Sequence, residues 1–86
     1  MYLYEMEYND GMSGNILING DDVYIPMTKT PFIKQANVKC HGVSGHGFIS
    51  IDEAIYLAPE DEKADFIDLK RHILGGVVLE QVNNDN

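Results

Sequence analysis

The sequence predicts an α+β domain, built as a small antiparallel sheet or partly closed barrel with one C-terminal amphipathic helix and a last strand. Three observations support this prediction: alternating apolar residues with two turn sequences in the first 27 residues, one later segment with helical periodicity, and a length of 86 residues with 44% apolar content. A chain of this size buries one small core. We therefore expect a single domain over residues 1–82 and a disordered polar tail over residues 83–86.

A three-strand meander is predicted over residues 2–27. In YLYEMEY, tyrosine and methionine alternate with leucine and glutamate, which is the period of a strand with one apolar face. The turn sequence NDG at residues 9–11 ends this strand, and Asn19-Gly20 is the strongest short hairpin signal of the chain. Pro26 closes the third strand because proline has no N–H to donate to a neighbouring strand.

The middle of the chain, residues 28–47, lacks a clear period. Phe32, Ile33 and Val38 are expected to anchor an extended segment to the sheet. The glycines of KCHGVSGHG, residues 39–47, predict a flexible loop. Its histidines belong to the residue type whose charge changes near neutral pH, so they are candidates for tuning an interaction with pH.

The segment FISIDEAIYLAP, residues 48–59, fits two structures. Ser50 followed by Glu53 fits a helix capping box, whereas the β-branched and aromatic residues of the segment fit a strand. We favour a strand, kinked at Asp52-Glu53, because Pro59 opens a much clearer helix.

One helix is predicted over residues 60–74. Pro59 suits the first helical position, three acids follow it and basic residues stand at the opposite end, which is the order that the helix dipole favours. Gly75-Gly76 ends the helix, and VVLEQV after it predicts the last strand. The apolar stripe of the helix consists of Phe66, Leu69 and Ile73, widened by Ile67 and Leu74.

No catalytic or metal site is predicted, although residues 39–47 contain the only cysteine and two of the three histidines. A structural zinc site needs four ligands with short paired spacings, which this chain does not offer in Cys40, His41, His46 and His72. The stretch GVSGH lacks the second glycine of a nucleophile elbow. We therefore expect a protein that is not an enzyme and carries no cofactor, with a small metal-dependent or Cys/His hydrolase as the minority alternative.

Acidic residues dominate the chain, whose net charge is −8, and they gather in two groups. Residues 1–27 carry five acids and no lysine or arginine, and residues 51–68 carry seven acids against Lys63, whereas residues 28–50 hold three lysines and no acid. Acidic surfaces repel nucleic acid and attract basic partners. We expect the two groups to bind a partner. The candidate residues are Glu5, Glu7, Asp21, Asp22, Asp52, Glu53, Asp61, Asp65 and Asp68.

In size, in acidity and in the lack of a catalytic motif, the chain resembles the small acidic proteins that bacteriophages make to inhibit host machinery, including DNA mimics and anti-defence inhibitors. The two acidic groups carry this resemblance, and the lysines of residues 28–50 differ from a uniformly acidic mimic. The resemblance implies an inhibitor that docks on a basic surface of a nucleic-acid-binding or defence protein of the host. An alternative is a small β-rich structural or oligomerisation domain of a virion or regulatory assembly, including a homodimer.

Neither a membrane span nor a secretory leader is predicted. No apolar run approaches the roughly 20 residues that cross a bilayer, and no N-terminal stretch shows a basic region followed by a long apolar run. One cysteine makes no internal disulfide. We therefore expect a cytoplasmic protein that binds neither membrane nor nucleic acid directly.

Overall fold

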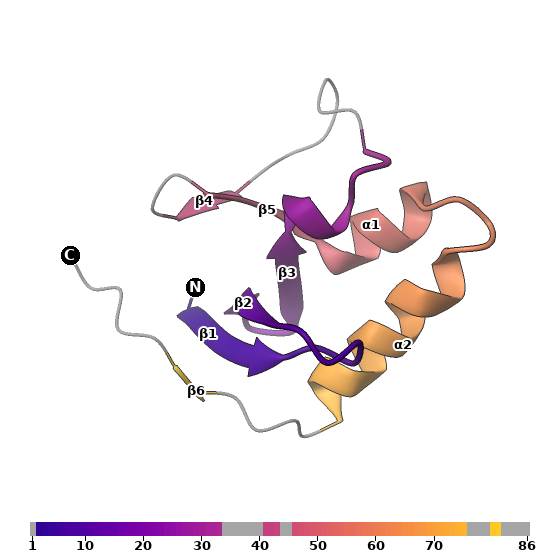
Figure 1. Ribbon diagram of the computed structural model, residues 1–86. Helices are drawn as coiled ribbons and strands as arrows, with labels where there is room; N and C mark the ends of the chain where they lie inside the picture. Colours follow the sequence, from indigo (N-terminus) through magenta and orange to yellow (C-terminus); the bar gives the residue numbers. More distant parts are fainter. Residues whose placement is uncertain (1, 34–40, 44–45, 76–79, 82–86) are drawn as a thin grey trace.

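An open antiparallel sheet and two helices make up the described part of the chain, residues 2–33, 41–43, 46–75 and 80–81 of the computed structural model (Figure 1). The sheet order is β4-β5-β3-β2-β1-β6, with four longer strands in the middle and a short strand at each edge. The α+β class is confirmed, and the sheet is open rather than a partly closed barrel. The strands are β1 (Tyr2–Glu7), β2 (Ser13–Asn19), β3 (Asp22–Pro26), β4 (His41–Val43), β5 (His46–Ser50) and β6 (Glu80–Gln81). The helical elements are the 3-10 turn η1 (Met27–Lys29) and the helices α1 (Ile51–Leu57) and α2 (Lys63–Leu74).

The predicted meander is confirmed, since β1 pairs with β2 and β2 with β3, both antiparallel. In the first turn, Gly11 adopts a φ of 85°, and its N–H donates to the carbonyl oxygen of Tyr8 at 3.0 Å. Glycine adopts this left-handed conformation without the clash that a Cβ atom would cause. The turn sequence NDG therefore forms the turn that its residue types predict.

The second hairpin turns one residue later than Asn19-Gly20 predicts. Asn19 pairs with Asp22 in the β2–β3 register, so the two turn residues are Gly20 and Asp21. Gly20 has a φ of 63°, which places the glycine at the first turn position. The hairpin itself is confirmed.

A β4–β5 hairpin takes the place of the flexible loop that the glycines of residues 39–47 predict. Gly42 pairs with Gly47, and β5 pairs in turn with β3. The prediction is wrong for the described part of this segment because pairing with an existing sheet satisfies its backbone hydrogen-bonding groups, whatever its weak local propensity. Val38, Cys40 and the residues between β4 and β5 lie outside the described residues.

Residues 51–57 form a helix, so the predicted strand is wrong beyond Ser50. Ser50 occupies the N-cap position of α1, and the two acids of the first turn lie where the helix dipole favours them. Ile51, Ala54 and Ala58 are buried, and their spacing of three and four residues places them on one side of a helix. The Ser50 side chain makes no capping hydrogen bond, so burial of this apolar side stabilises α1.

The second helix, α2, begins at Lys63, three residues later than predicted. The backbone N–H groups of Glu62 and Lys63 donate to the carbonyl oxygen of Pro59 at 2.8 and 3.1 Å, so residues 59–62 form a turn that leads into the helix. At the other end, the Gly75 N–H donates to the Arg71 carbonyl oxygen at 2.7 Å. The predicted stop at Gly75 is confirmed.

The apolar stripe of α2 is narrower than predicted. Phe66, Leu69 and Ile73 are buried against the sheet. Ile67 is 38% exposed and Leu74 60% exposed, and both line a shallow apolar groove beside α1 rather than the core. Helical periodicity identified the buried residues and overestimated the width of the buried face.

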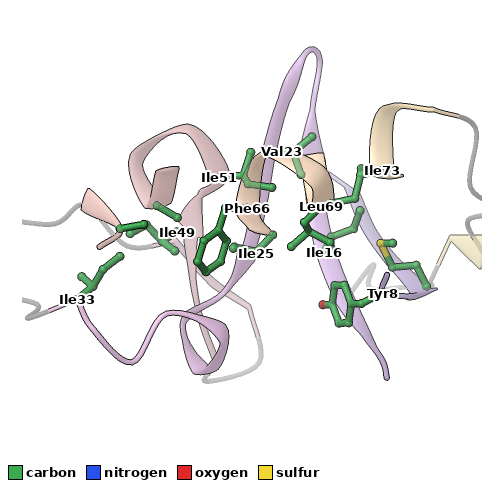
Figure 2. Close-up of a cluster of buried hydrophobic side chains, with 13 residues drawn as sticks. Tyr8, Ile16, Val23, Ile25, Ile33, Ile49, Ile51, Phe66, Leu69 and Ile73 are labelled. Atoms are coloured by element: carbon green, nitrogen blue, oxygen red, sulfur yellow. The ribbon is translucent and has the colours of Figure 1, made fainter. Parts of the chain in front are cut away.

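The main core lies between the two helices and one face of the sheet (Figure 2). Ile16, Ile25 and Ile49, from three adjacent strands, are fully buried there. Phe32 packs its ring edge-on against Phe66, with ring centroids 5.6 Å apart, and the residue after it is also buried. Residues 32–33 therefore anchor their segment to the core as predicted, but η1 and the turn after it replace the predicted extended conformation.

The last strand is confirmed for Glu80–Gln81, which pair antiparallel with β1 as β6 (Figure 1). The rest of VVLEQV and the predicted tail lie outside the described residues. Among the residues that the structure describes, no helix is long and apolar enough to cross a membrane.

Candidate functional site

The candidate acids occupy two opposite layers of the molecule. Leu3 of β1 belongs to a second apolar cluster, with Leu17 and Phe48, and this cluster includes no helical residue. Since side chains alternate along a strand, the cluster lies on the sheet face turned away from the helices. Glu5 and Glu7 follow Leu3 at two-residue spacing, so they lie on that same face and are exposed.

Asp22 shares this sheet face, because Tyr24, two residues later, packs against the second cluster. Asp21 lies in the turn directly before Asp22. The structure therefore places the N-terminal candidates on the sheet and the remaining candidates on the helical layer, and it does not bring the two groups onto one surface. The candidates of the helical layer are Asp52, Glu53, Asp61, Asp65 and Asp68.

Two lysines of α2 hold α1 in place. The Lys63 Nζ donates to the carbonyl oxygens of Ile55 and Tyr56 at 2.8 and 2.9 Å, and so binds the C-terminal end of α1. Seven residues later, the Lys70 Nζ lies 2.6 Å from Asp52 Oδ1 at the N-terminal end of α1. Asp52 is therefore already paired with a cation and is the least available of the helical candidates.

Three acids line the other side of α2. Asp61, Asp65 and Asp68 are spaced by four and three residues, so they lie along one side of the helix and its leading turn; we call them the acidic flank. Lys63 and Lys70 mark the opposite side, which faces α1. Within the described residues, no cation lies within salt-bridge distance of the Asp61 and Asp65 carboxylates.

Asp68 has one weak partner. The Arg71 Nη1 lies 3.8 Å from Asp68 Oδ1, and both side chains are mostly exposed. Such surface pairs contribute about 0–1 kcal/mol, because water screens the attraction and the long side chain loses entropy. All three carboxylates of the acidic flank are thus exposed to solvent.

A hollow of about 700 Å³ opens beside the acidic flank, between α2, the β1–β2 turn and η1. Its floor contains the buried side chains of Tyr8, Phe66 and Leu69, which Figure 2 shows within the core cluster. Its rim includes the exposed carboxylates of Asp10 and Asp65. An apolar floor with a few polar groups at the rim is the usual construction of a ligand pocket, and the volume falls in the ordinary range of such pockets.

Tyr8 is held tightly in the floor of this hollow. Its hydroxyl donates to the Asn15 carbonyl oxygen at 2.5 Å, and its ring lies against Gly14, where an added Cβ would be 2.6 Å from Tyr8 Cε2. Burial, followed by the negative charge of Asp10, raises the pKa of Tyr8 to about 12. Tyr8 is therefore a neutral aromatic group at physiological pH.

Lys29 covers the Tyr8 ring and pairs with Asp10. The Lys29 Nζ lies 4.0 Å from the ring centroid and 3.0 Å from Asp10 Oδ2. The Met12 N–H donates to Asp10 Oδ1 at 3.0 Å, and this bond, followed by the Lys29 ammonium, holds the pKa of Asp10 below its ordinary value. The hollow thus already contains one cation held by an aromatic ring and a carboxylate.

Sequence reasoning missed this hollow. Tyr8 and Lys29 are 21 residues apart, and only the folded chain brings them together. Asp10 belongs to the N-terminal acidic group and to the first turn, and its sequence context does not single it out as a site residue. One signal was present: a glycine inside a strand, such as Gly14, often marks the close approach of another group.

Among the residues that the structure describes, which do not include Cys40, no group of three or more His, Cys, Asp or Glu side chains is placed to hold a metal ion. The backbone register pairs His41 with Phe48 and His46 with Val43. His72 lies elsewhere, with its Nε2 3.1 Å from the Glu7 carbonyl oxygen, to which it donates. The His72 side chain therefore connects α2 to the end of β1.

Comparisons of the chain with protein-family models, with curated proteins and with solved structures found no match. The geometry of the acidic flank and of the neighbouring hollow is therefore the basis for assigning a function.

Proposed function

We propose that the protein is a non-catalytic binding module that docks its acidic flank on a basic surface of a partner protein. One observation carries this proposal: Asp61, Asp65 and Asp68 present exposed carboxylates along one side of α2 and its leading turn, while the lysines on the other side of α2 are engaged with α1. Carboxylates so arranged attract a basic surface and speed its association.

The proposed role is that of an inhibitor in the cytoplasm of a bacterial host, of the kind made by phages for host takeover or anti-defence. A partner that binds nucleic acid or acts in defence offers the basic surface that such a module needs. The net charge of −8 supports a protein partner rather than a nucleic acid, which carries the same sign of charge.

The test starts from a partner captured from host lysate and then purified. We expect the triple reversal Asp61→Lys, Asp65→Lys and Asp68→Lys to weaken binding by at least about tenfold, which corresponds to roughly 1.4 kcal/mol. The loss should appear mainly in the association rate, and the affinity of the parent protein should fall as salt increases.

The matched control is the triple reversal Glu5→Lys, Glu7→Lys and Asp22→Lys on the sheet face turned away from the helices. It changes the net charge by the same amount on the opposite layer of the molecule. A larger loss of affinity in the acidic-flank variant than in the control supports the proposal. Equal losses would show that net charge alone matters, and a larger loss in the control would move the interface to the sheet.

A further inference from the structure

We propose that the hollow beside the acidic flank receives one arginine side chain of the basic partner. This inference rests on the proposed function and names the place where a cation of the partner is bound. The aliphatic part of the arginine would lie on Phe66 and Leu69, and its guanidinium would pair with Asp65, since Asp10 is already paired with Lys29.

The construction of the hollow supports a cationic ligand with an apolar stem. Phe66 and Leu69 provide a buried apolar floor, whereas Asp10 and Asp65 stand at the exposed rim. An arginine side chain matches this order, since its methylene groups favour apolar contact and its charged end favours carboxylates. The volume of about 700 Å³ leaves room for the side chain and for some of the backbone that carries it.

The charges of the lining also favour a cation. Three charged side chains line the hollow: Asp10, Lys29 and Asp65. Lys29 neutralises Asp10 at 3.0 Å, whereas Asp65 has no salt-bridge partner among the residues that the structure describes. The lining therefore carries an excess of one negative charge, on the side that borders α2.

Lys29 shows that this part of the molecule holds a cation. Its ammonium group lies over Tyr8 and against Asp10, which is the combination of aromatic face and carboxylate that binds cations elsewhere in proteins. Because Lys29 occupies the Tyr8 face, the partner's cation takes the remaining carboxylate, Asp65. Arginine suits this position better than lysine because a guanidinium binds a carboxylate with two parallel hydrogen bonds and sheds water more easily.

The experiment is a titration of the isotope-labelled protein with N-acetyl-arginine amide, followed by amide chemical shifts. We expect saturable shifts at Gly14, Asp10 and Asp65, with a dissociation constant on the order of 10 mM, as befits one isolated side chain. N-acetyl-citrulline amide, which has the same shape without the charge, should not bind. N-acetyl-lysine amide should bind several-fold more weakly than the arginine derivative.

Two matched variants locate the cation. Asp65→Asn should weaken binding of the arginine derivative by about tenfold, whereas Asp68→Asn removes the same charge from the same helix outside the hollow and should leave binding nearly unchanged. Lys29→Met leaves Asp10 without its cation and should strengthen binding several-fold. Unchanged amide shifts in β3 and β5 would show that each variant keeps the fold.

The inference would be overturned if Asp65→Asn and Asp68→Asn lost equal affinity, or if the citrulline derivative bound as well as the arginine derivative. It would also be overturned if about 100 mM of the arginine derivative, ten times the expected dissociation constant, caused no shift. These outcomes are separate from the test of the proposed function. If they occur while the triple reversal of the acidic flank still weakens partner binding, the arginine site is wrong and the proposed docking surface is retained. If the triple reversal has no effect, the proposed function fails.

Discussion

Tyr8, which follows β1, connects this end of the strand to β2 and to η1 through one side chain. Its hydroxyl binds the Asn15 carbonyl of β2, its ring covers Gly14, and its face receives the Lys29 ammonium from η1. A strand glycine is unfavourable by itself, and an aromatic side chain packed across it compensates for the missing side chain. Gly14, the glycine that weakens β2 by itself, is therefore the residue against which Tyr8 packs.

Gly14→Ala tests this arrangement. The new Cβ would stand 2.6 Å from Tyr8 Cε2, so the ring must move and its contacts with Asn15 and Lys29 must change. We expect the free energy of unfolding, measured by urea denaturation, to fall by about 1–3 kcal/mol, as in other overpacked cores.

Gly47→Ala is the matched control, because Gly47 is also a strand glycine and its added Cβ would be in ordinary contact, 3.5 Å from the sulfur of Met27. We expect its free energy of unfolding to stay within about 0.5 kcal/mol of the parent, or to increase slightly. A Gly14→Ala protein as stable as the Gly47→Ala protein would contradict the close approach of Tyr8.

At the scale of residues, the sequence was sufficient to predict the exposure of the acidic flank and insufficient to predict the contacts around Tyr8. Asp61, Asp65 and Asp68 are predicted by their charge and helical spacing, and the structure finds them exposed. The partnership of Lys29 with Tyr8 was beyond prediction because it depends on how η1 folds back against the first hairpin. Contacts between residues far apart in the chain leave no local pattern.

At the scale of elements, α1 shows why a short helix is hard to predict. Its seven residues include β-branched and aromatic side chains that favour strands, and its capping sequence makes no side-chain hydrogen bond in the structure. The helix forms because Ile51 and Ala54 bury one side in the core and because α2 supports both ends. In contrast, α2 has twelve residues and a clear apolar period, which made it predictable.

Lys63→Met tests the support that α2 gives to α1. The substitution keeps an apolar stem of similar length and removes the ammonium that binds the Ile55 and Tyr56 carbonyls. We expect the free energy of unfolding to fall by about 1 kcal/mol, because two carbonyls at a helix end lose a charged donor. Urea denaturation followed by circular dichroism measures the loss.

Arg71→Met provides the control on the same helix. The Arg71 side chain is mostly exposed and lies 3.8 Å from Asp68, so its removal should change the free energy of unfolding by less than about 0.5 kcal/mol. If both variants lose the same stability, a general loss of positive charge, rather than the bond to α1, is responsible.

At the scale of the whole molecule, negative charge covers both layers. The sheet face turned away from the helices carries Glu5, Glu7 and Asp22, and the helical layer carries the acidic flank. Like charges repel within a folded chain, and salt screens the repulsion. The folded state therefore carries a destabilising charge that a partner's basic surface would relieve.

We expect added salt to stabilise the isolated protein. About 0.5 M sodium chloride should raise the melting temperature by roughly 4–8 °C, the shift that about 1 kcal/mol produces in a domain of this size. The variant Asp61→Asn, Asp65→Asn and Asp68→Asn should melt higher than the parent at low salt and respond less to the same addition. A melting temperature that falls with salt would show that attractive pairs, such as Lys70 with Asp52, outweigh the repulsion.

The position of β6 has a consequence for the order of folding. β1 lies near the start of the sequence, and β6, from near the end, pairs with Tyr4 and Glu5 on its outer edge (Figure 1). During synthesis on the ribosome, the β1–β2–β3 meander can pair from neighbouring residues while the outer edge of β1 still presents open backbone groups. The nascent chain therefore has an edge that can recruit a strand from another molecule until residues 80–81 emerge and pair with the middle of β1. The time between these two events is the period in which aggregation competes with folding.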